Sequence, residues 1–208
     1  MISVAEAERR MLEQVSPLPP EVCPLEAASG RVLREAVMAA RPAPPFDRVM
    51  MDGYALSVAA WKAGRRDYLV QTTVPAGVPP PSLADSNGAI GVMTGGVLPK
   101  GADWVVPVEW CERQAERIQI RAPSEVEPSS GLYIHAAGCD GPAGRTVLPP
   151  GVRLGPCEMA VLATENRSSV SCSPKPRIRL ITTGDEVVPV GGAARPWQIY
   201  GSHAIAAS

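Results

Sequence analysis

Two short glycine-containing segments carry side chains suited to chemistry. Asp52 stands directly before Gly53, and a turn there would let a ligand approach the backbone closely, because glycine has no Cβ. The competing interpretation is that Asp52 accepts hydrogen bonds from its own turn amides, as aspartate often does. Thr94-Gly95-Gly96 offers a hydroxyl and consecutive N–H groups at the end of a predicted strand, which indicates either an anion-binding nest or a simple turn between strands.

Four further acids are considered by their position. Asp140 lies between Cys139 and Gly141, where it could orient a substrate, take part in proton transfer, or stabilise its own loop as an acceptor. Asp185 and Glu186 directly follow an apolar run over 177–183 that predicts a buried parallel strand. Because open α/β sheets bind ligands just beyond the carboxyl ends of their strands, we expect these two acids to be functional. Glu109 is expected to be an exposed carboxylate at a sheet edge.

The cysteines suggest neither disulfides nor a structural metal site. There are five of them, far apart, and none forms a C-x-x-C pair. His135 and Cys139 are four residues apart, but two ligands without a third nearby do not make a metal site, so none is assigned there.

Composition excludes several classes of protein. The 208 residues carry a formal charge of −1, so no strong positive field exists to bind nucleic acid. No apolar run approaches the roughly 20 residues that span a bilayer. With 45% hydrophobic residues, the chain can bury a sizeable core. These features predict a soluble cytoplasmic protein that binds neither nucleic acid nor a membrane.

The elements that must position these residues can be read from the sequence. Ser3 to Glu6 is typical of a capping box, and a helix is expected over residues 3–15 with a stripe of Val4, Ala7 and Met11 facing a core. The segment Arg41–Pro45 contains three prolines, which predicts a stiff extended connector.

The middle of the chain reads as β-structure. Runs at 68–74, 89–93, 104–108 and 117–120 are rich in strand-forming residues and are bounded by turn residues. The proline-rich segment 75–81 is expected to be an irregular loop. Gly155-Pro156 opens a helix that should end near Asn166 and return to the first part of the chain.

Four motifs in order resemble the MoeA and gephyrin E-domain family of molybdopterin molybdotransferases. Pro45-Phe46-Asp47 followed by M-D-G-Y-A at 51–55 is the strongest match. T-G-G-V-L-P-K-G-A-D at 94–103, Gly138-x-Asp140 and T-G-D-E at 183–186 complete the series.

The resemblance implies an α+β architecture. An elongated mixed α/β domain would consist of two segments, 1–45 and 141–176, with a β-rich, barrel-like domain at 46–140 inserted between them. Residues 177–208 would begin an α/β domain that binds molybdopterin, and we expect the chain to stop before this domain is complete. The family also implies a homodimer formed through the first domain, in which the third domain of one subunit faces the first two domains of the other.

The resemblance also implies a reaction. Molybdate is joined to adenylylated molybdopterin, AMP is released, and Mg²⁺ is required as cofactor; other proteins of molybdenum cofactor biosynthesis are possible partners. By family position, the residues implied in catalysis are Asp52, Thr94, Asp140 and Glu186, those implied in cofactor binding are Gly53, Gly95, Gly96 and Asp185, and those implied in metal binding are Asp52, Asp185 and Glu186.

Departures from the family pattern lie near the motifs. Arg48-Val49 replaces a small polar residue, Gly91 and His135 replace arginines, and Gly201 and His203 replace an Asp and an Asn. A histidine is a weaker, pH-dependent anion donor than arginine, so reduced cofactor affinity is expected. We expect the isolated chain to be inactive. The alternatives are a non-catalytic molybdopterin-binding or assembly module that keeps the dimer surface and, at the level of fold, a β-domain that binds another small anion.

Overall fold

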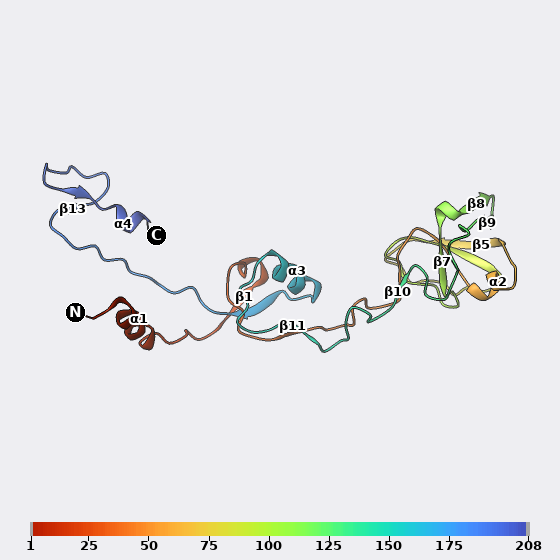
Figure 1. Ribbon diagram of the computed structural model, residues 1–208, viewed down its shortest axis with the longest axis horizontal. Helices are drawn as coiled ribbons and strands as arrows, with labels where there is room; N and C mark the ends of the chain where they lie inside the picture. The colour runs from red at the N-terminus through yellow and green to blue at the C-terminus, as the bar shows by residue number, and fades with distance from the viewer. Residues whose placement is uncertain (1, 207–208) are drawn as a thin grey trace.

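The computed structural model describes residues 2–206 and shows a mixed α+β chain whose elements are spread along one long axis (Figure 1). A six-stranded sheet forms a body at one end, and a smaller body of paired segments lies in the middle. Short elements from both ends of the chain lie at the other end. This is the α+β class predicted from the sequence, while the predicted domain boundaries stay predictions. No helix within residues 2–206 is long and apolar enough to cross a membrane.

The six-stranded sheet has the strand order β7-β4-β6-β5-β9-β8, in which β5 and β6 run parallel and the other neighbours antiparallel. Its strands are β4 (Gly53–Leu56), β5 (Asp67–Val74), β6 (Gly88–Val92), β7 (Trp104–Pro107), β8 (Cys111–Gln114) and β9 (Arg117–Ile120), with the short helix α2 (Val58–Lys62) and the single turn η2 (Val108–Trp110) between them. The four strands predicted between residues 68 and 120 are confirmed as β5, β6, β7 and β9, and 75–81 is the expected irregular loop.

Both faces of this sheet are covered by apolar side chains. One cluster is built around Trp104, Tyr68 and Leu56, and a second around Ile90 and Val105. Strands β4, β6 and β7 are buried along their whole length for this reason. A buried side chain of this size stabilises the fold by about 1.5–3 kcal/mol, so the two clusters hold the sheet curled on itself.

The middle body is built from two segments that are far apart in the sequence. Strand β1 (Glu21–Pro24), followed by the turn η1 (Leu25–Ala27), pairs antiparallel with β12 (Ser169–Cys172). The helix α3 (Pro156–Thr164) buries Leu162 in the same apolar cluster as Leu33 and Val37. The helix therefore packs against the first part of the chain, as predicted.

Two extended segments connect the middle body to the sheet and run side by side (Figure 1). Strand β2 (Val37–Met38) pairs with β11 (Thr146–Leu148), and β3 (Arg48–Val49) pairs with β10 (Ile134–His135). Between these pairs, the Ala43 N–H donates to the Gly141 carbonyl at 2.9 Å and the Asp140 N–H donates to the Ala43 carbonyl at 2.9 Å. The proline-rich connector is thus fixed by hydrogen bonds to the returning segment.

The helix α1 (Val4–Glu13) forms as predicted, but its apolar stripe is not in the core. The Ser3 hydroxyl accepts from the Glu6 N–H at 3.2 Å, while the Glu6 carboxylate pairs with Arg9 and Arg10 instead of reaching back to the helix start. Val4 and Met11 are exposed, at 86% and 63%. Periodicity shows which face of a helix is apolar, but burial also requires a neighbouring surface, and α1 lies away from the clusters of the two bodies (Figure 1).

The strand predicted over residues 177–183 is wrong. This segment is extended but unpaired, and Ile178 and Ile181 are 80% and 76% exposed. Beyond it, β13 (Val187–Val188) and β14 (Ile199–Tyr200) form a two-residue parallel pair, and α4 (Ser202–Ala206) follows. A buried strand needs neighbouring strands and a covering layer, and the described residues supply neither here.

Candidate functional site

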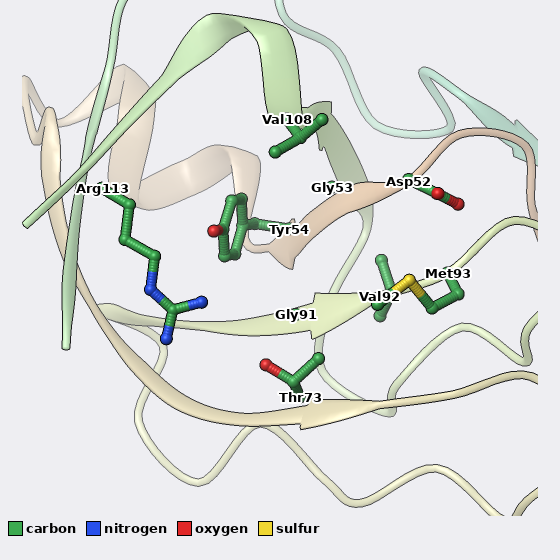
Figure 2. A pocket seen from close by; sticks show the side chains of 9 residues that line it. All are labelled: Asp52, Gly53, Tyr54, Thr73, Gly91, Val92, Met93, Val108 and Arg113. Atoms are coloured by element: carbon green, nitrogen blue, oxygen red, sulfur yellow. The ribbon is translucent and has the colours of Figure 1, made fainter. Parts of the chain in front are cut away.

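A pocket of about 280 Å³ opens on the large sheet, where β4 and β6 face the start of η2 and β8 (Figure 2). Backbone and side chains of the three neighbouring strands β4, β6 and β5 form its floor, and Arg113 reaches over it from β8. The lining residues are Asp52, Gly53, Tyr54, Thr73, Gly91, Val92, Met93, Val108 and Arg113. The pocket therefore contains one carboxylate and one guanidinium, separated by an aromatic ring and small residues.

Asp52 is held by the loop that follows β6. Its Oδ1 accepts hydrogen bonds from the Thr94 N–H and the Thr94 hydroxyl, both at 2.7 Å. These bonds, the side-chain one first, lower the pKa of Asp52 because they stabilise its charged form. The hydrogen bonds to Asp52 do not come from its own turn: the side chain joins two loops that are 42 residues apart. Within residues 2–206, no side chain or amide donates to Oδ2, which is left available to a ligand.

The amides at 94–96 do not form the predicted anion nest. The Thr94 N–H donates to Asp52, the Gly95 N–H donates to the Val49 carbonyl at 2.9 Å, and the Gly96 N–H donates to the Met93 carbonyl at 3.0 Å. All three donors are used inside the protein, so the segment is a tight turn that anchors Asp52. Any role of Gly95 and Gly96 in cofactor binding stays a prediction.

Gly53 lies in a central strand and not in a turn. It begins β4, which is paired with β6 on one side and β7 on the other. A Cβ at this position would lie 1.9 Å from the Val106 carbonyl oxygen of β7. The absence of a side chain is thus required by the neighbouring strand, and this requirement is independent of any ligand.

Sequence reasoning missed three pocket residues that carry a polar group. They are Tyr54, Thr73 and Arg113, and each comes from a different strand. Figure 2 shows the Arg113 guanidinium beside the Tyr54 ring. The Nε of Arg113 donates to the Ala115 carbonyl at 3.1 Å. Arg113 is one of several charged residues in an exposed strand, and no local pattern marks it. Gly91 leaves the floor of this pocket open, because a Cβ there would meet Thr73 Oγ1 at 2.6 Å.

A second polar cluster lies where β3 pairs with β10. Arg48 donates to Nδ1 of His135 at 2.9 Å, and Nε2 of His135 lies 3.0 Å from Oδ1 of Asp140. The hydrogen bond from His135 is the main cause that lowers the pKa of Asp140. The thiol of Cys139 also donates to Asp140 Oδ1 at 3.6 Å. The expectation that His135 and Cys139 have no third potential ligand nearby was wrong, because the Asp140 carboxylate lies close to both side chains.

Asp47, from the first motif, links this second cluster to the loop that holds Asp52. Its Oδ1 accepts from the Ala137 N–H at 2.8 Å, and its carbonyl accepts from the Leu98 N–H at 2.9 Å. The motif residue therefore connects the 94–98 loop with the 136–140 loop. Glu109 is exposed in η2, as expected.

Asp185 and Glu186 lie neither at the pocket around Asp52 nor at the cluster around His135. They are exposed, and they lie beside β13 at the opposite end of the molecule from the large sheet (Figure 1). Within one chain, the predicted metal ligands Asp52, Asp185 and Glu186 therefore do not form one site.

The chain has a distinctive architecture. It is a curled, mostly antiparallel sheet at the end of two paired connecting segments. Residues 2–165 match the family described as MoeA N-terminal region (domain I and II). The chain therefore belongs to the MoeA family.

Individual relatives agree with this assignment. The chain is 36% identical over 190 residues to a molybdopterin molybdenumtransferase of Synechocystis sp., covering 91% of this chain and 48% of that protein. It is 32% identical over 209 residues to molybdopterin molybdenumtransferase 2 of Mycobacterium tuberculosis, covering 99% and 51%. The crystal structure of the molybdopterin biosynthesis MoeA protein from Pyrococcus horikosii matches with a TM-score of 0.79 at 30% identity, covering 100% of this chain and 53% of that chain. The chain thus spans about half the length of these relatives.

Proposed function

We propose that this chain acts in molybdenum cofactor biosynthesis and supplies one wall of a molybdopterin molybdenumtransferase site, where molybdate is inserted into adenylylated molybdopterin with release of AMP. Family membership supports the reaction class. The observation that carries the proposal is the pocket that places Asp52, anchored by Thr94, and Arg113 around one space.

The charges of this pocket suit anionic substrates. Molybdate and the phosphate groups of an adenylylated pterin are negatively charged, and Arg113 offers a permanent positive charge with several N–H donors. Asp52 keeps a fixed orientation because Thr94 holds its Oδ1 twice. In this proposal Arg113 binds the anion, while Oδ2 of Asp52 positions a substrate hydroxyl, a water molecule or a cation.

The predicted magnesium ligands Asp52, Asp185 and Glu186 fit the proposal as one set only if they come from two chains. Mg²⁺ prefers oxygen ligands in an octahedron, commonly one or two carboxylates together with phosphate oxygens and waters. Oδ2 of Asp52 is one such ligand, and Asp185 and Glu186 would have to come from the partner subunit of a homodimer, since they lie far from Asp52 in the same chain. A bound Mg²⁺ would neutralise phosphate charge in this site.

Calorimetric titration with adenylylated molybdopterin tests the binding part of the proposal. Arg113→Gln should weaken binding about tenfold or more, because a hydrogen bond to a charged group contributes about 1.5–3 kcal/mol. Arg121→Gln is the matched control, since Arg121 pairs with Glu112 outside the pocket. Asp52→Ala should also weaken binding. Unchanged affinity in both Arg113→Gln and Asp52→Ala would show that this pocket does not bind the substrate.

Transfer is tested separately from binding. Mass-resolved molybdenum incorporation is measured with the chain alone and after addition of a separate polypeptide that carries the third domain of a relative. Transfer that requires the added polypeptide supports a shared site. Substrate binding without transfer under either condition supports the alternative, a non-catalytic molybdopterin-binding module.

A further inference from the structure

The three side chains of His135, Cys139 and Asp140 place three different types of metal ligand around one point. Nε2 of His135 lies 3.0 Å from Asp140 Oδ1, and Sγ of Cys139 lies 3.6 Å from the same oxygen. The candidate ligand atoms of all three residues lie within 4.8 Å of one another. An imidazole nitrogen, a thiolate and a carboxylate together form a donor set that suits zinc and related transition metals better than magnesium.

Two of the three ligand separations can be compared with those of a tetrahedral zinc site. Zinc bonds of about 2.3 Å to sulfur and about 2.0–2.2 Å to nitrogen and oxygen place an S···O pair about 3.6 Å apart and an N···O pair about 3.4 Å apart. The observed S···O distance already matches, and the observed N···O distance has to lengthen by about 0.4 Å. Side-chain rotation suffices for this change, because Cys139 and Asp140 are exposed.

The backbone holds these ligands in place without a metal. His135 is fixed in β10 by pairing with β3. The Asp140 N–H donates to the Ala43 carbonyl at 2.9 Å, and the Ala137 N–H donates to Asp47 Oδ1 at 2.8 Å. Little backbone entropy is therefore lost when a metal ion binds, and three protein ligands leave the fourth position open to water.

We propose that His135, Cys139 and Asp140 bind one zinc-type divalent metal ion. On binding, the Cys139 thiol releases its proton to solvent, and the proton on Nε2 of His135 is exchanged for the metal while Nδ1 takes up a proton. Asp140 binds as the carboxylate. One proton per metal ion is released in total.

In the metal-free protein, the contact between Arg48 and His135 disfavours metal binding. Arginine can only donate hydrogen bonds, so its contact with Nδ1 of His135 requires that nitrogen to be an acceptor. In the metal-bound form Nδ1 carries a proton, and the exposed Arg48 side chain must turn away. Arg48→Gln removes a positive charge and supplies an amide oxygen that can accept from Nδ1–H. This substitution should therefore tighten metal binding by about tenfold or more, the range expected for a partner of a metal ligand.

Titration with Co²⁺ and Zn²⁺ tests the proposal. The chain should bind one Co²⁺ with a thiolate-to-cobalt charge-transfer band, and Zn²⁺ should displace it. Cys139→Ser should abolish this band, and His135→Ala and Asp140→Asn should each raise the Kd at least tenfold. Cys157→Ser is the matched control, since Cys157 is an exposed cysteine on α3, and it should leave the band unchanged.

Two results would overturn the proposal. The first is the absence of a charge-transfer band in the parent chain, and the second is a band that survives Cys139→Ser. Arg48→Gln keeps the test independent of any loss of fold, because it predicts tighter binding. The readout is metal binding and not molybdenum transfer, so its failure is distinguishable from failure of the proposed function.

Discussion

Replacing Gly53 by alanine tests why a glycine begins the central strand β4. The added Cβ would lie 1.9 Å from the Val106 carbonyl oxygen and 2.9 Å from its carbonyl carbon, whereas ordinary contact begins at 3.4 Å. The difference between 3.4 and 1.9 Å means that β4 and β7 must separate locally by about 1.5 Å. Neighbouring strands lie about 4.8 Å apart, so a shift of this size weakens the hydrogen bonds beside Gly53.

The expected cost follows from these contacts. Overpacking costs about 1–3 kcal/mol, and one or two weakened backbone hydrogen bonds add about 0.5–1.5 kcal/mol each. We therefore expect Gly53→Ala to lower the free energy of unfolding of the sheet by about 1.5–6 kcal/mol. Urea unfolding followed by tryptophan fluorescence is a suitable assay, because Trp61, Trp104 and Trp110 all lie in or against the core of this sheet.

Gly91→Ala is the matched control in the adjacent strand β6. There the new Cβ meets Thr73 Oγ1 at 2.6 Å and Thr73 Cγ2 at 3.0 Å, atoms of an exposed side chain that can rotate. Its cost should be about 1–2 kcal/mol. If Gly53→Ala is no more destabilising than Gly91→Ala, the steric reasoning is refuted. Normal stability combined with weaker substrate binding would instead favour close approach of a ligand at Gly53.

Three shorter predictions concern other contacts. Thr94→Val should raise the pKa of Asp52 towards its usual value, as measured by carboxyl NMR. Because the pKa of Asp52 is lowered in the folded chain, the Asp52–Thr94 hydrogen bonds stabilise the fold fully above about pH 4, and this stabilisation is lost as the pH falls through the lowered pKa. Burial raises the pKa of Cys111 to about 12, so at pH 8 Cys157 should be alkylated much faster in a mass-spectrometric time course, and equal rates would contradict this. Asp103→Ala should destabilise the sheet by about 1 kcal/mol in urea unfolding, because its carboxylate accepts from the first N–H of α2 at 2.7 Å; an unchanged midpoint would contradict that role.

Much of the large sheet could be predicted from local pattern. The runs that became β5, β6, β7 and β9 are short, apolar and bounded by turn residues, which is a local property. Strand β4 was missed because M-D-G-Y-A contains a glycine after an aspartate, which locally favours a turn. Its strand conformation depends on two neighbours, β6 and β7, that are distant in the sequence.

Failures at both ends of the chain have a common cause. Burial was predicted for the stripe on α1 from its helical spacing and for the run at 177–183 from its apolar composition, but both are exposed. Burial requires a partner surface, and hydrophobicity alone does not show whether the same chain provides one.

The sequence by itself determined the family, through four ordered motifs, and it indicated Asp52 and Asp140 as residues of interest. The tertiary structure decided what these residues contact: Thr94 for Asp52, and His135 for Asp140. It also brought Arg113 to the pocket and placed Asp140 beside His135 and Cys139. For Asp52 the physical reason is that its contact joins two loops 42 residues apart, a separation that motif spacing does not describe. His135, Cys139 and Asp140 are close along the chain, and how their side chains meet depends on the conformation of their loop, which Ala43 and Asp47 hold by hydrogen bonds from distant positions.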